Sequence, residues 1–244
     1  MILGNIRWMK AIILAAGLGT RMGSIGKTIP KCLFQIKGKP LLERQIELLT
    51  NTGIGRKDIY VVIGRQGECW SKENIEKINS LGLKVIMNPR NADFNQTYSF
   101  LLGIEATSKE SMLVMDGDLI VTSNLVRQIA SNKDNSTFLI QTPKSKNQVG
   151  NKIILNGNKR IIRVTRENID IDFVSYAGMF FIAEKDWEGF KEEAKKEEYH
   201  EEDLGFVFDT LCKTREFYTF LNNTEWLNIN TPEDLEQALS VING

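Results

Sequence analysis

The first half of the chain alternates short apolar runs with segments whose apolar residues recur at helical spacing. Runs rich in β-branched side chains, typical of strands buried on both faces, cover residues 11–14, 59–63, 83–87 and 112–115. Helical spacing and cap residues predict helices over residues 41–52, 72–81, 97–107 and 123–130. This alternation predicts an α/β fold, a Rossmann-like, doubly wound and mostly parallel sheet with helices on both faces.

The second half of the chain has a different pattern. Residues 152–155 and 160–164 flank Asn156-Gly157, a strong hairpin signal, and residues 173–182 predict a long strand. Residues 184–198 predict a charged helix with a solvated face. Thr231, Pro232 and Asp234 predict the start of a last helix. We therefore expect one domain over residues 1–244, with an antiparallel insert at about 143–182 and an N-terminal extension over residues 1–8.

Composition narrows the possible functions. The chain has 244 residues, 42% of them hydrophobic, and 31 basic residues balance 31 acidic ones. A sizeable core is therefore expected, and the zero net charge disfavours nucleic-acid binding. No apolar run is long enough to cross a membrane and no secretory leader is visible, so we expect a cytoplasmic protein with small-molecule partners.

The cysteines and the histidine restrict the metal chemistry. Cys32, Cys69 and Cys212 are widely spaced, and His200 is the chain's one histidine. Zinc sites built from Cys and His, and catalytic triads that need His, are therefore disfavoured. A metal would have to be held by oxygen ligands, which favours Mg²⁺.

A glycine-rich segment after the first predicted strand is the strongest chemical signal. Leu14 to Met22 reads LAAGLGTRM. The Rossmann pattern GxGxxG fails because Met22 stands at its third glycine, and the Walker pattern fails because Arg21 stands at its first. What is left is a turn of small residues whose backbone N–H groups can approach a triphosphate.

Charged side chains near this turn fit phosphoryl chemistry. Arg21 and Lys31 supply two cations suited to a phosphoryl group that gains charge in the transition state. Asp116 and Asp118 follow a predicted central strand, where a carboxylate faces the ligand crevice of an α/β sheet. Asp118 is the expected ligand, whereas Asp116 either supports the metal site or caps the turn.

Several motifs together resemble the nucleotidyltransferase superfamily that includes sugar-1-phosphate, phosphocholine and methylerythritol-phosphate nucleotidylyltransferases. The first motif is LxxGxGxRM…PKxL, formed by residues 14–22 and 30–33. Residues 95–100 are similar to the NxxYS segment of the phosphocholine branch, residues 115–118 to a hydrophobic-D-x-D segment, and residues 226–235 to a WxDxDTPEDL ending. The resemblance covers most of the chain and implies a GT-A-like nucleotidyltransferase fold.

The resemblance also implies residue roles. Arg21 and Lys31 would stabilise the pentacovalent α-phosphate, and Asp118 would ligate Mg²⁺. The nucleotide would be bound by Leu14, Ala15, Ala16, Gly17, Gly19, Thr20, Thr97 and Ser99. The second metal ligand of the family is an aspartate at the position of Asn228, and Asn230 is likewise an amide here. An amide can ligate Mg²⁺ but adds no charge, so weaker metal affinity is expected.

The acceptor is predicted less directly. Aromatic residues of the insert and of the segment after it could form a wall with one carboxylate suited to a cationic amine: Tyr176, Phe180, Phe181, Phe206, Phe208 and Asp209. Aromatic residues at strand spacing usually belong to the core, so core packing is the alternative for them. Arg163 and Arg166 could hold the acceptor phosphate, whereas Glu167, Asn168 and Lys144 could serve a sugar's hydroxyl groups.

Three functions follow from these predictions. The first is transfer of CMP from CTP to a small phosphorylated acceptor, namely phosphocholine, phosphoethanolamine, aminoethylphosphonate or a similar compound. The second is a sugar-1-phosphate nucleotidyltransferase using UTP, dTTP, CTP or GTP. The third is a nucleotide-binding protein without activity. A homodimer is compatible with each.

Overall fold

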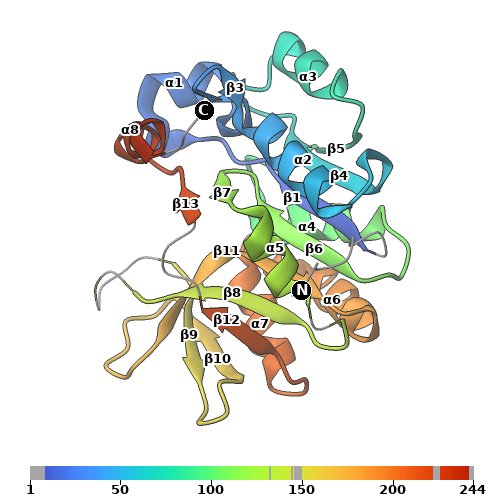
Figure 1. Cartoon of the computed structure of the whole chain (residues 1–244), viewed down its shortest axis with the longest axis vertical. Helices are drawn as coiled ribbons and strands as arrows, with labels where there is room; N and C mark the ends of the chain where they lie inside the picture. Colours follow the sequence, from blue (N-terminus) through green and yellow to red (C-terminus); the bar gives the residue numbers. More distant parts are fainter. Residues whose placement is uncertain (1–8, 132, 144, 146–149, 222–225, 242–244) are drawn as a thin grey trace.

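A nine-stranded sheet runs through the protein and is covered by helices (Figure 1). The computed structural model describes residues 9–131, 133–143, 145, 150–221 and 226–241. The main path of the sheet has the spatial order β10 (Ile161–Thr165), β9 (Lys152–Leu155), β11 (Val174–Ile182), β6 (Met112–Asp116), β1 (Lys10–Leu14), β4 (Ile59–Gly64) and β5 (Lys84–Asn88). Beside this path, β8 (Thr137–Gln141) pairs with β11, and β12 (Tyr218–Leu221) pairs with β8.

The parallel part of the sheet confirms the predicted strands. β1 lies between β4 and β6 and is parallel to both, and β5 continues the parallel order beyond β4. Ile12, Ile13 and their partners in β4 and β6 are buried, as expected for strands covered on both faces. The carboxyl ends of β1 and β6 therefore meet at one edge of the sheet.

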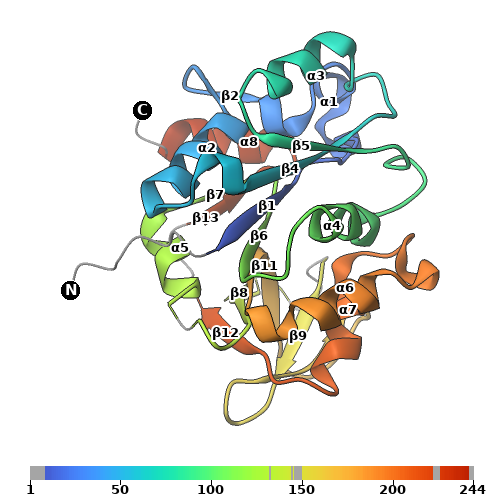
Figure 2. The ribbon, with the colours of Figure 1, turned by 90° about the vertical axis from the view of Figure 1, so that its right-hand side faces the viewer.

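Helices cover both faces of this sheet. The α-helices are α1 (Gly23–Thr28), α2 (Leu41–Thr52), α3 (Lys72–Asn79), α4 (Gln96–Glu105), α5 (Ser123–Ile129), α6 (Trp187–Ala194), α7 (Leu204–Cys212) and α8 (Pro232–Val241). Short 3₁₀ helices are η1 (Thr20–Met22), η2 (Lys31–Leu33), η3 (Arg56–Asp58), η4 (Glu184–Asp186) and η5 (Glu197–Tyr199). Figure 2 shows α2 and α5 on one side of the sheet and α4, α6 and α7 on the other, and two separate buried clusters match these layers.

The antiparallel part of the sheet begins at β11, which pairs antiparallel with β6, β8 and β9. β9 and β10 form the predicted hairpin around Asn156 and Gly157. In that turn the Asn156 side chain accepts hydrogen bonds from the backbone N–H groups of Asn158 and Arg160. The insert thus extends the same sheet.

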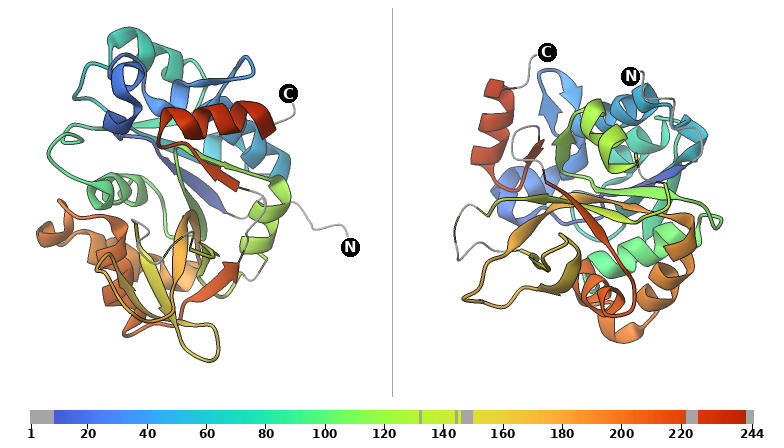
Figure 3. Two further views of the ribbon diagram at one scale, coloured as in Figure 1. Left: turned by 90° about the vertical axis from the view of Figure 1, so that its left-hand side faces the viewer. Right: turned by 60° about the horizontal axis from the view of Figure 1, so that its bottom comes forward.

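The end of the chain returns to its beginning. β13 (Trp226–Asn228) pairs antiparallel with β7 (Leu119–Val121), and β2 (Gln35–Ile36) pairs with β3 (Lys39–Pro40). In Figure 3 the red helix α8 lies beside the blue N-terminal segments, and a third buried cluster joins Ala238 and Ile229 to Met22, Phe34 and Leu41. The predicted cap of α8 is present, since Asp234 accepts hydrogen bonds from the backbone N–H groups of Asn230 and Thr231.

The charges of residues 184–198 form the predicted solvated face, but the prediction of one continuous helix there is wrong. The segment divides into η4, α6 and η5, and Trp187, Phe190 and Ala194 are buried against the sheet. Charged residues dominate the composition of this segment, but its few apolar residues fall on one face of the helix, and that face packs against the sheet. No helix in the described ranges is long and apolar enough to cross a membrane. The predicted N-terminal extension, residues 1–8, lies outside the described residues.

Candidate active site

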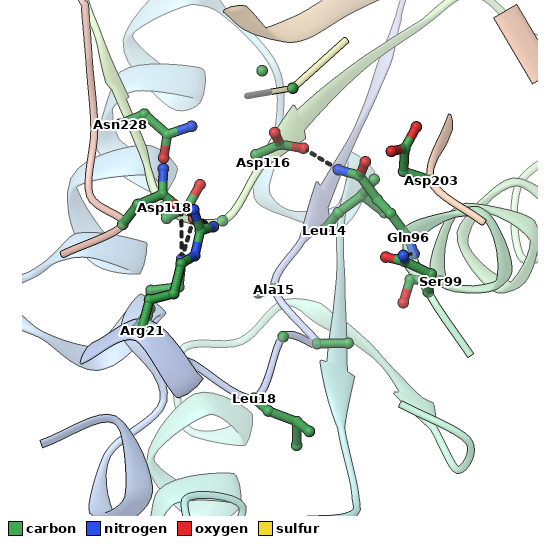
Figure 4. A pocket seen from close by; sticks show the side chains of 18 of the residues that line it. Leu14, Ala15, Leu18, Arg21, Gln96, Ser99, Asp116, Asp118, Asp203 and Asn228 are labelled. Carbon is green, nitrogen blue, oxygen red and sulfur yellow. Dashed lines mark hydrogen bonds and ion pairs between the residues drawn. The ribbon is translucent and has the colours of Figure 1, made fainter. Parts of the chain in front are cut away.

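A cleft of about 1040 Å³ opens at the carboxyl ends of β1 and β6, where ligands bind in open α/β sheets. Figure 4 shows Arg21, Asp118 and Asn228 on one side of it, and Gln96, Ser99 and Asp203 on the other. Asp116 lies between the two groups. The cleft therefore has one side that carries cations from the N-terminal segments and another side built by α4, the insert and the start of α7.

The turn after β1 forms one wall of the cleft. Leu14, Ala15, Ala16, Gly17, Leu18, Thr20 and Arg21 all line it. Gly19 does not: its backbone is left-handed, with φ +64°, and it packs against Gly26. Gly19 therefore shapes the turn that the sequence predicted, while its neighbours present backbone and small side chains to the cleft.

Lys31 and Arg21 converge on one point of this wall. The Lys31 ammonium lies 2.5 Å from Oδ2 of Asp118 and donates to Oδ1 of Asn230 at 3.2 Å. The Arg21 guanidinium donates to the same Asn230 oxygen at 2.5 Å. Segments that are 200 residues apart in the sequence thus place two cations together, as predicted.

Asp118 and Asn228 form a pair of oxygen donors. Asp118 directly precedes β7 and Asn228 ends the neighbouring strand β13, and the backbone N–H of Ile229 donates to the carbonyl of Asp118 at 2.9 Å. The buried Oδ1 atom of Asn228 has no hydrogen-bond partner in the described part of the chain. A carboxylate beside an unsatisfied amide oxygen fits a hard cation such as Mg²⁺. No cluster of three or more His, Cys, Asp or Glu side chains occurs among the described residues, consistent with an amide at position 228.

Asp116 is a buried carboxyl in the centre of the cleft. Its Oδ1 accepts a hydrogen bond of 2.5 Å from the side chain of Gln96, the first residue of α4. Burial, and then the charge of Asp118, raise the pKa of Asp116 well above its usual value. The Cα of Gly178 in β11 faces this carboxyl, and an added Cβ would lie 3.1 Å from Oδ2 of Asp116.

The opposite side of the cleft carries a second ion pair and a buried hydroxyl. Arg166 contacts Oδ2 of Asp203 at 2.6 Å, and Oδ1 of Asp203 accepts from the backbone N–H of Gly205 at the start of α7. The hydroxyl of Tyr176 is buried without a hydrogen-bond partner in the described ranges. Burial, with the charges of Asp116 and Asp203, raises the pKa of Tyr176 well above its usual value. Tyr176 and Arg166, two of the predicted acceptor residues, therefore both line the cleft, and their role stays a prediction.

Two predicted site residues do not line the cleft. Asp209 lies on α7, where its carboxylate accepts from the backbone N–H of Val164 and pairs with Lys213 at 2.8 Å. Thr97 is completely buried, because it lies one residue after Gln96 on α4 and so points about 100° away from it. Ser99 does line the cleft and accepts a hydrogen bond from Asn88.

Of the two alternatives for the aromatic residues, the structure supports packing in the core for Phe180, Phe181 and Phe208. Phe180, Phe181 and Phe208 are completely buried in the core, and Phe206 is 43% exposed on the outer face of α7. Of that set, Tyr176 alone lines the cleft, and its ring packs on Phe138, Phe180 and Phe208. Arg163 is exposed and pairs with Glu167, and Lys144 lies outside the described residues.

The structure adds residues to the cleft that the sequence did not single out, chiefly Gln96, Asn91, Gln141, Asn151, Glu201 and Asp203. Asp203 caps α7, and the order Asp-Leu-Gly before an apolar segment is a recognisable helix start. Gln96 is the first residue of α4, directly after the cap residue Asn95. Helix starts whose first turns face the edge of the sheet are therefore the signal that could have found both.

Comparison with known proteins identifies the family. Residues 11–170 match the family described as the MobA-like NTP transferase domain. A choline-phosphate cytidylyltransferase of Streptococcus pneumoniae is 38% identical over 120 residues, which are 49% of this chain and 48% of the relative. A 2-aminoethylphosphonate cytidylyltransferase of Lancefieldella rimae is 27% identical over 124 residues, 51% of this chain and 48% of the relative. The matched stretches thus span about half the length of these curated relatives.

Solved structures match over more of the chain. A CTP:phosphocholine cytidylyltransferase from S. pneumoniae superposes with a TM-score of 0.75 at 22% identity, covering 97% of this chain and 100% of that one. An inositol-1-phosphate CTP transferase from T. maritima has the same TM-score at 19% identity, covering 99% of this chain and 100% of that one. These likenesses show the nucleotidyltransferase fold, and the family match covers both β1 with its glycine turn and the turn that bears Asp118. The chain therefore belongs to the MobA-like NTP transferase family.

Proposed function

We propose that this protein is a Mg²⁺-dependent cytidylyltransferase that transfers CMP from CTP to a small phosphate or phosphonate carrying an amine, and releases pyrophosphate. The observation that carries the proposal is the division of one cleft into a side with the cations of Arg21 and Lys31 and a side with the carboxylate of Asp203, with the carboxyl group of Asp116 between them. A triphosphate fits the first side and an ammonium group fits the second. The cleft volume of about 1040 Å³ can hold two small ligands together.

The turn after β1 binds the nucleotide in this proposal. Its backbone N–H groups and small side chains let the phosphates approach closely, and Ser99 with Asn91 lines the part of the cleft left for ribose and base. Asp118 and Asn228 hold Mg²⁺, which supplies charge neutralisation for the triphosphate and the departing pyrophosphate.

The reaction needs no nucleophilic side chain. A phosphate or phosphonate oxygen of the acceptor attacks the α-phosphorus in line, the bond from the α-phosphorus to the bridging oxygen of the pyrophosphate breaks, and that oxygen keeps the electron pair. Lys31 exchanges its contact with Asp118 for the non-bridging oxygens of the α-phosphate, and Arg21 neutralises the same group. Catalysis then comes from positioning and charge stabilisation.

Support for CTP comes from the relatives, several of which are named as cytidylyltransferases of choline phosphate or aminoalkylphosphonates. Support for an amine comes from the cleft itself, which Asp116, Asp203 and the ring of Tyr176 all line. We also propose that the reaction takes place in the cytoplasm. The homodimer stays a prediction, which light scattering of the protein in solution can test.

A sugar 1-phosphate is the second candidate acceptor. Gln141 and Asn151 line the acceptor side with amides that suit hydroxyl groups, and a bifunctional sugar-1-phosphate nucleotidylyltransferase/acetyltransferase of Sulfurisphaera tokodaii is 30% identical over 139 residues. A protein that only binds nucleotide is disfavoured, because Arg21, Lys31 and Asp118 all remain and converge. If the wild-type protein shows no turnover, Asn228→Asp, which restores a carboxylate, distinguishes two explanations. Turnover in the variant would indicate weak metal binding in the wild type, and continued absence of turnover would indicate that the acceptor is missing from the screen.

The test is pyrophosphate release with Mg²⁺, in which four nucleoside triphosphates are screened against phosphocholine, phosphoethanolamine, 2-aminoethylphosphonate and several sugar 1-phosphates. The proposal predicts release with CTP and an amine-bearing acceptor. Release only with a sugar 1-phosphate would replace it with the second candidate. No release in the screen, even from Asn228→Asp, would contradict both.

A further inference from the structure

Gln45 is a buried polar side chain on α2 that reaches the edge of the sheet. The residue is 2% exposed, and it lies in the face of the helix that packs on the sheet. Its amide nitrogen donates to two backbone carbonyls, that of Asp116 at 2.9 Å and that of Leu119 at 2.8 Å. These carbonyls enclose the turn that carries Asp118.

The orientation of the Gln45 amide follows from its partners. Both are carbonyl oxygens, which only accept hydrogen bonds, so the NH₂ group must face them. The oxygen of the Gln45 amide is buried and has no partner in the described part of the chain. Burying the unsatisfied oxygen of Gln45 costs free energy. Such a cost calls for an explanation, and the two hydrogen bonds that fix this turn supply one.

The same turn is held on two further sides. The backbone N–H of Gly117 donates to the carbonyl of Leu14 at 2.8 Å, and the backbone N–H of Ile229 donates to the carbonyl of Asp118 at 2.9 Å. β1 and β13 therefore fix the middle of the turn, whereas Gln45 fixes its two ends. Without Gln45, two backbone carbonyls would face the buried surface of α2 without a donor.

We propose that Gln45 is the positioning residue for the metal-binding turn, holding Asp118 at the distance from Asn228 that a divalent cation requires. This inference rests on the metal site of the proposed function, but it does not depend on the nucleotide or the acceptor. Gln45 itself touches neither substrate nor metal. Loss of such supporting hydrogen bonds commonly lowers metal affinity by about 10- to 100-fold.

The test measures Mn²⁺ binding by electron paramagnetic resonance, with and without CTP, so its readout is independent of turnover. Gln45→Met keeps the length of the side chain and removes both donors. Thr52→Val is the matched control, because Thr52 is also completely buried on α2, but its hydroxyl donates only to the carbonyl of Leu49 within the same helix. Thermal melting of both variants records the loss of stability.

We expect Gln45→Met to weaken Mn²⁺ binding at least tenfold, and Thr52→Val to leave it within twofold of the wild type. Equal weakening in both variants, or wild-type affinity in Gln45→Met, would overturn the assignment. If Gln45→Met does not fold, Gln45→Asn gives the same test, because its shorter amide cannot reach both carbonyls. A wild-type protein that binds Mn²⁺ but releases no pyrophosphate would overturn the proposed function and leave the role of Gln45 standing.

Discussion

At the scale of single residues, Lys31 is the group on which turnover should depend most. Its side chain is 16% exposed and its ammonium contacts Asp118, so the ammonium can move to a phosphate by a change of side-chain rotamer. We expect Lys31→Ala to lower kcat about a hundredfold or more, as for other fixed groups that stabilise transition-state charge. Steady-state kinetics of pyrophosphate release measures this change.

The matched control is Lys27→Ala, because Lys27 is an exposed lysine on the neighbouring helix α1. It should leave kcat within twofold. A Lys31→Ala enzyme with the wild-type rate would place the chemistry elsewhere in the cleft.

Cys32 follows Lys31 directly, yet it should be unreactive. Burial raises the pKa of the Cys32 thiol to about 12, so at pH 8 only about one molecule in ten thousand carries the nucleophilic thiolate. Cys69 and Cys212 are also buried, and burial raises the pKa of each. We expect an aromatic disulfide reagent at pH 8 to label none of the three in the native protein and all three in guanidinium chloride. Rapid labelling of native Cys32 would show that the wall of the cleft is open.

Site residues were predictable where the sequence itself fixes their place. Arg21 and Lys31 lie in a motif next to a strand end, and Asp118 directly follows a central strand, so all three were found from the sequence. Thr97 was assigned from the resemblance and Asp209 from its place beside the aromatic residues, but the direction of a side chain on a helix changes by about 100° per residue. Gln45 gave no signal, because its partners lie 71 and 74 residues away.

At the scale of elements, the meeting of β1 and β6 requires glycine at position 117. A Cβ there would lie 2.7 Å from Cβ and 2.8 Å from Cα of Ala15, and 2.9 Å from the carbonyl oxygen of Leu14. Since part of this obstruction is backbone, the turn that carries Asp118 would have to shift. We expect Gly117→Ala to cost about 1–3 kcal/mol of unfolding free energy and to abolish most turnover.

Chemical denaturation and pyrophosphate release measure the two effects. Gly157→Ala is the control, because a Cβ at this hairpin position would meet nothing within 4 Å. Comparable losses in both variants would contradict a specific role for Gly117.

Helices and strands were predictable where the local sequence carries a clear signal. The parallel strands, α2 with its C-terminal Gly53, and the Asn-Gly hairpin follow from local signals and are present. β8 and β12 carry no comparable signal and exist because β11 offers an edge to β8, which in turn offers an edge to β12. The charged run at residues 184–198 has the predicted solvated face, but it does not show where the helix is interrupted, whereas the packing of Trp187 and Phe190 on the sheet fixes the position of α6.

At the scale of the whole molecule, the chain crosses between its two halves several times. β11 pairs with β6, and β13 returns from the end of the chain to pair with β7. We propose that the chain is one domain and therefore expect a single cooperative thermal transition with equal calorimetric and van't Hoff enthalpies. Two resolved transitions would show that the insert unfolds separately.

The central claim is nucleotidyl transfer at the α-phosphate of CTP. The most direct measurement follows CTP labelled at either the α- or the γ-phosphate, mixed with Mg²⁺ and 2-aminoethylphosphonate or phosphoethanolamine, with the products separated by chromatography. We predict that the α-label enters a cytidine conjugate of the acceptor and that the γ-label leaves as pyrophosphate. Transfer of the γ-label to the acceptor, or release of CMP without a conjugate, would contradict the account.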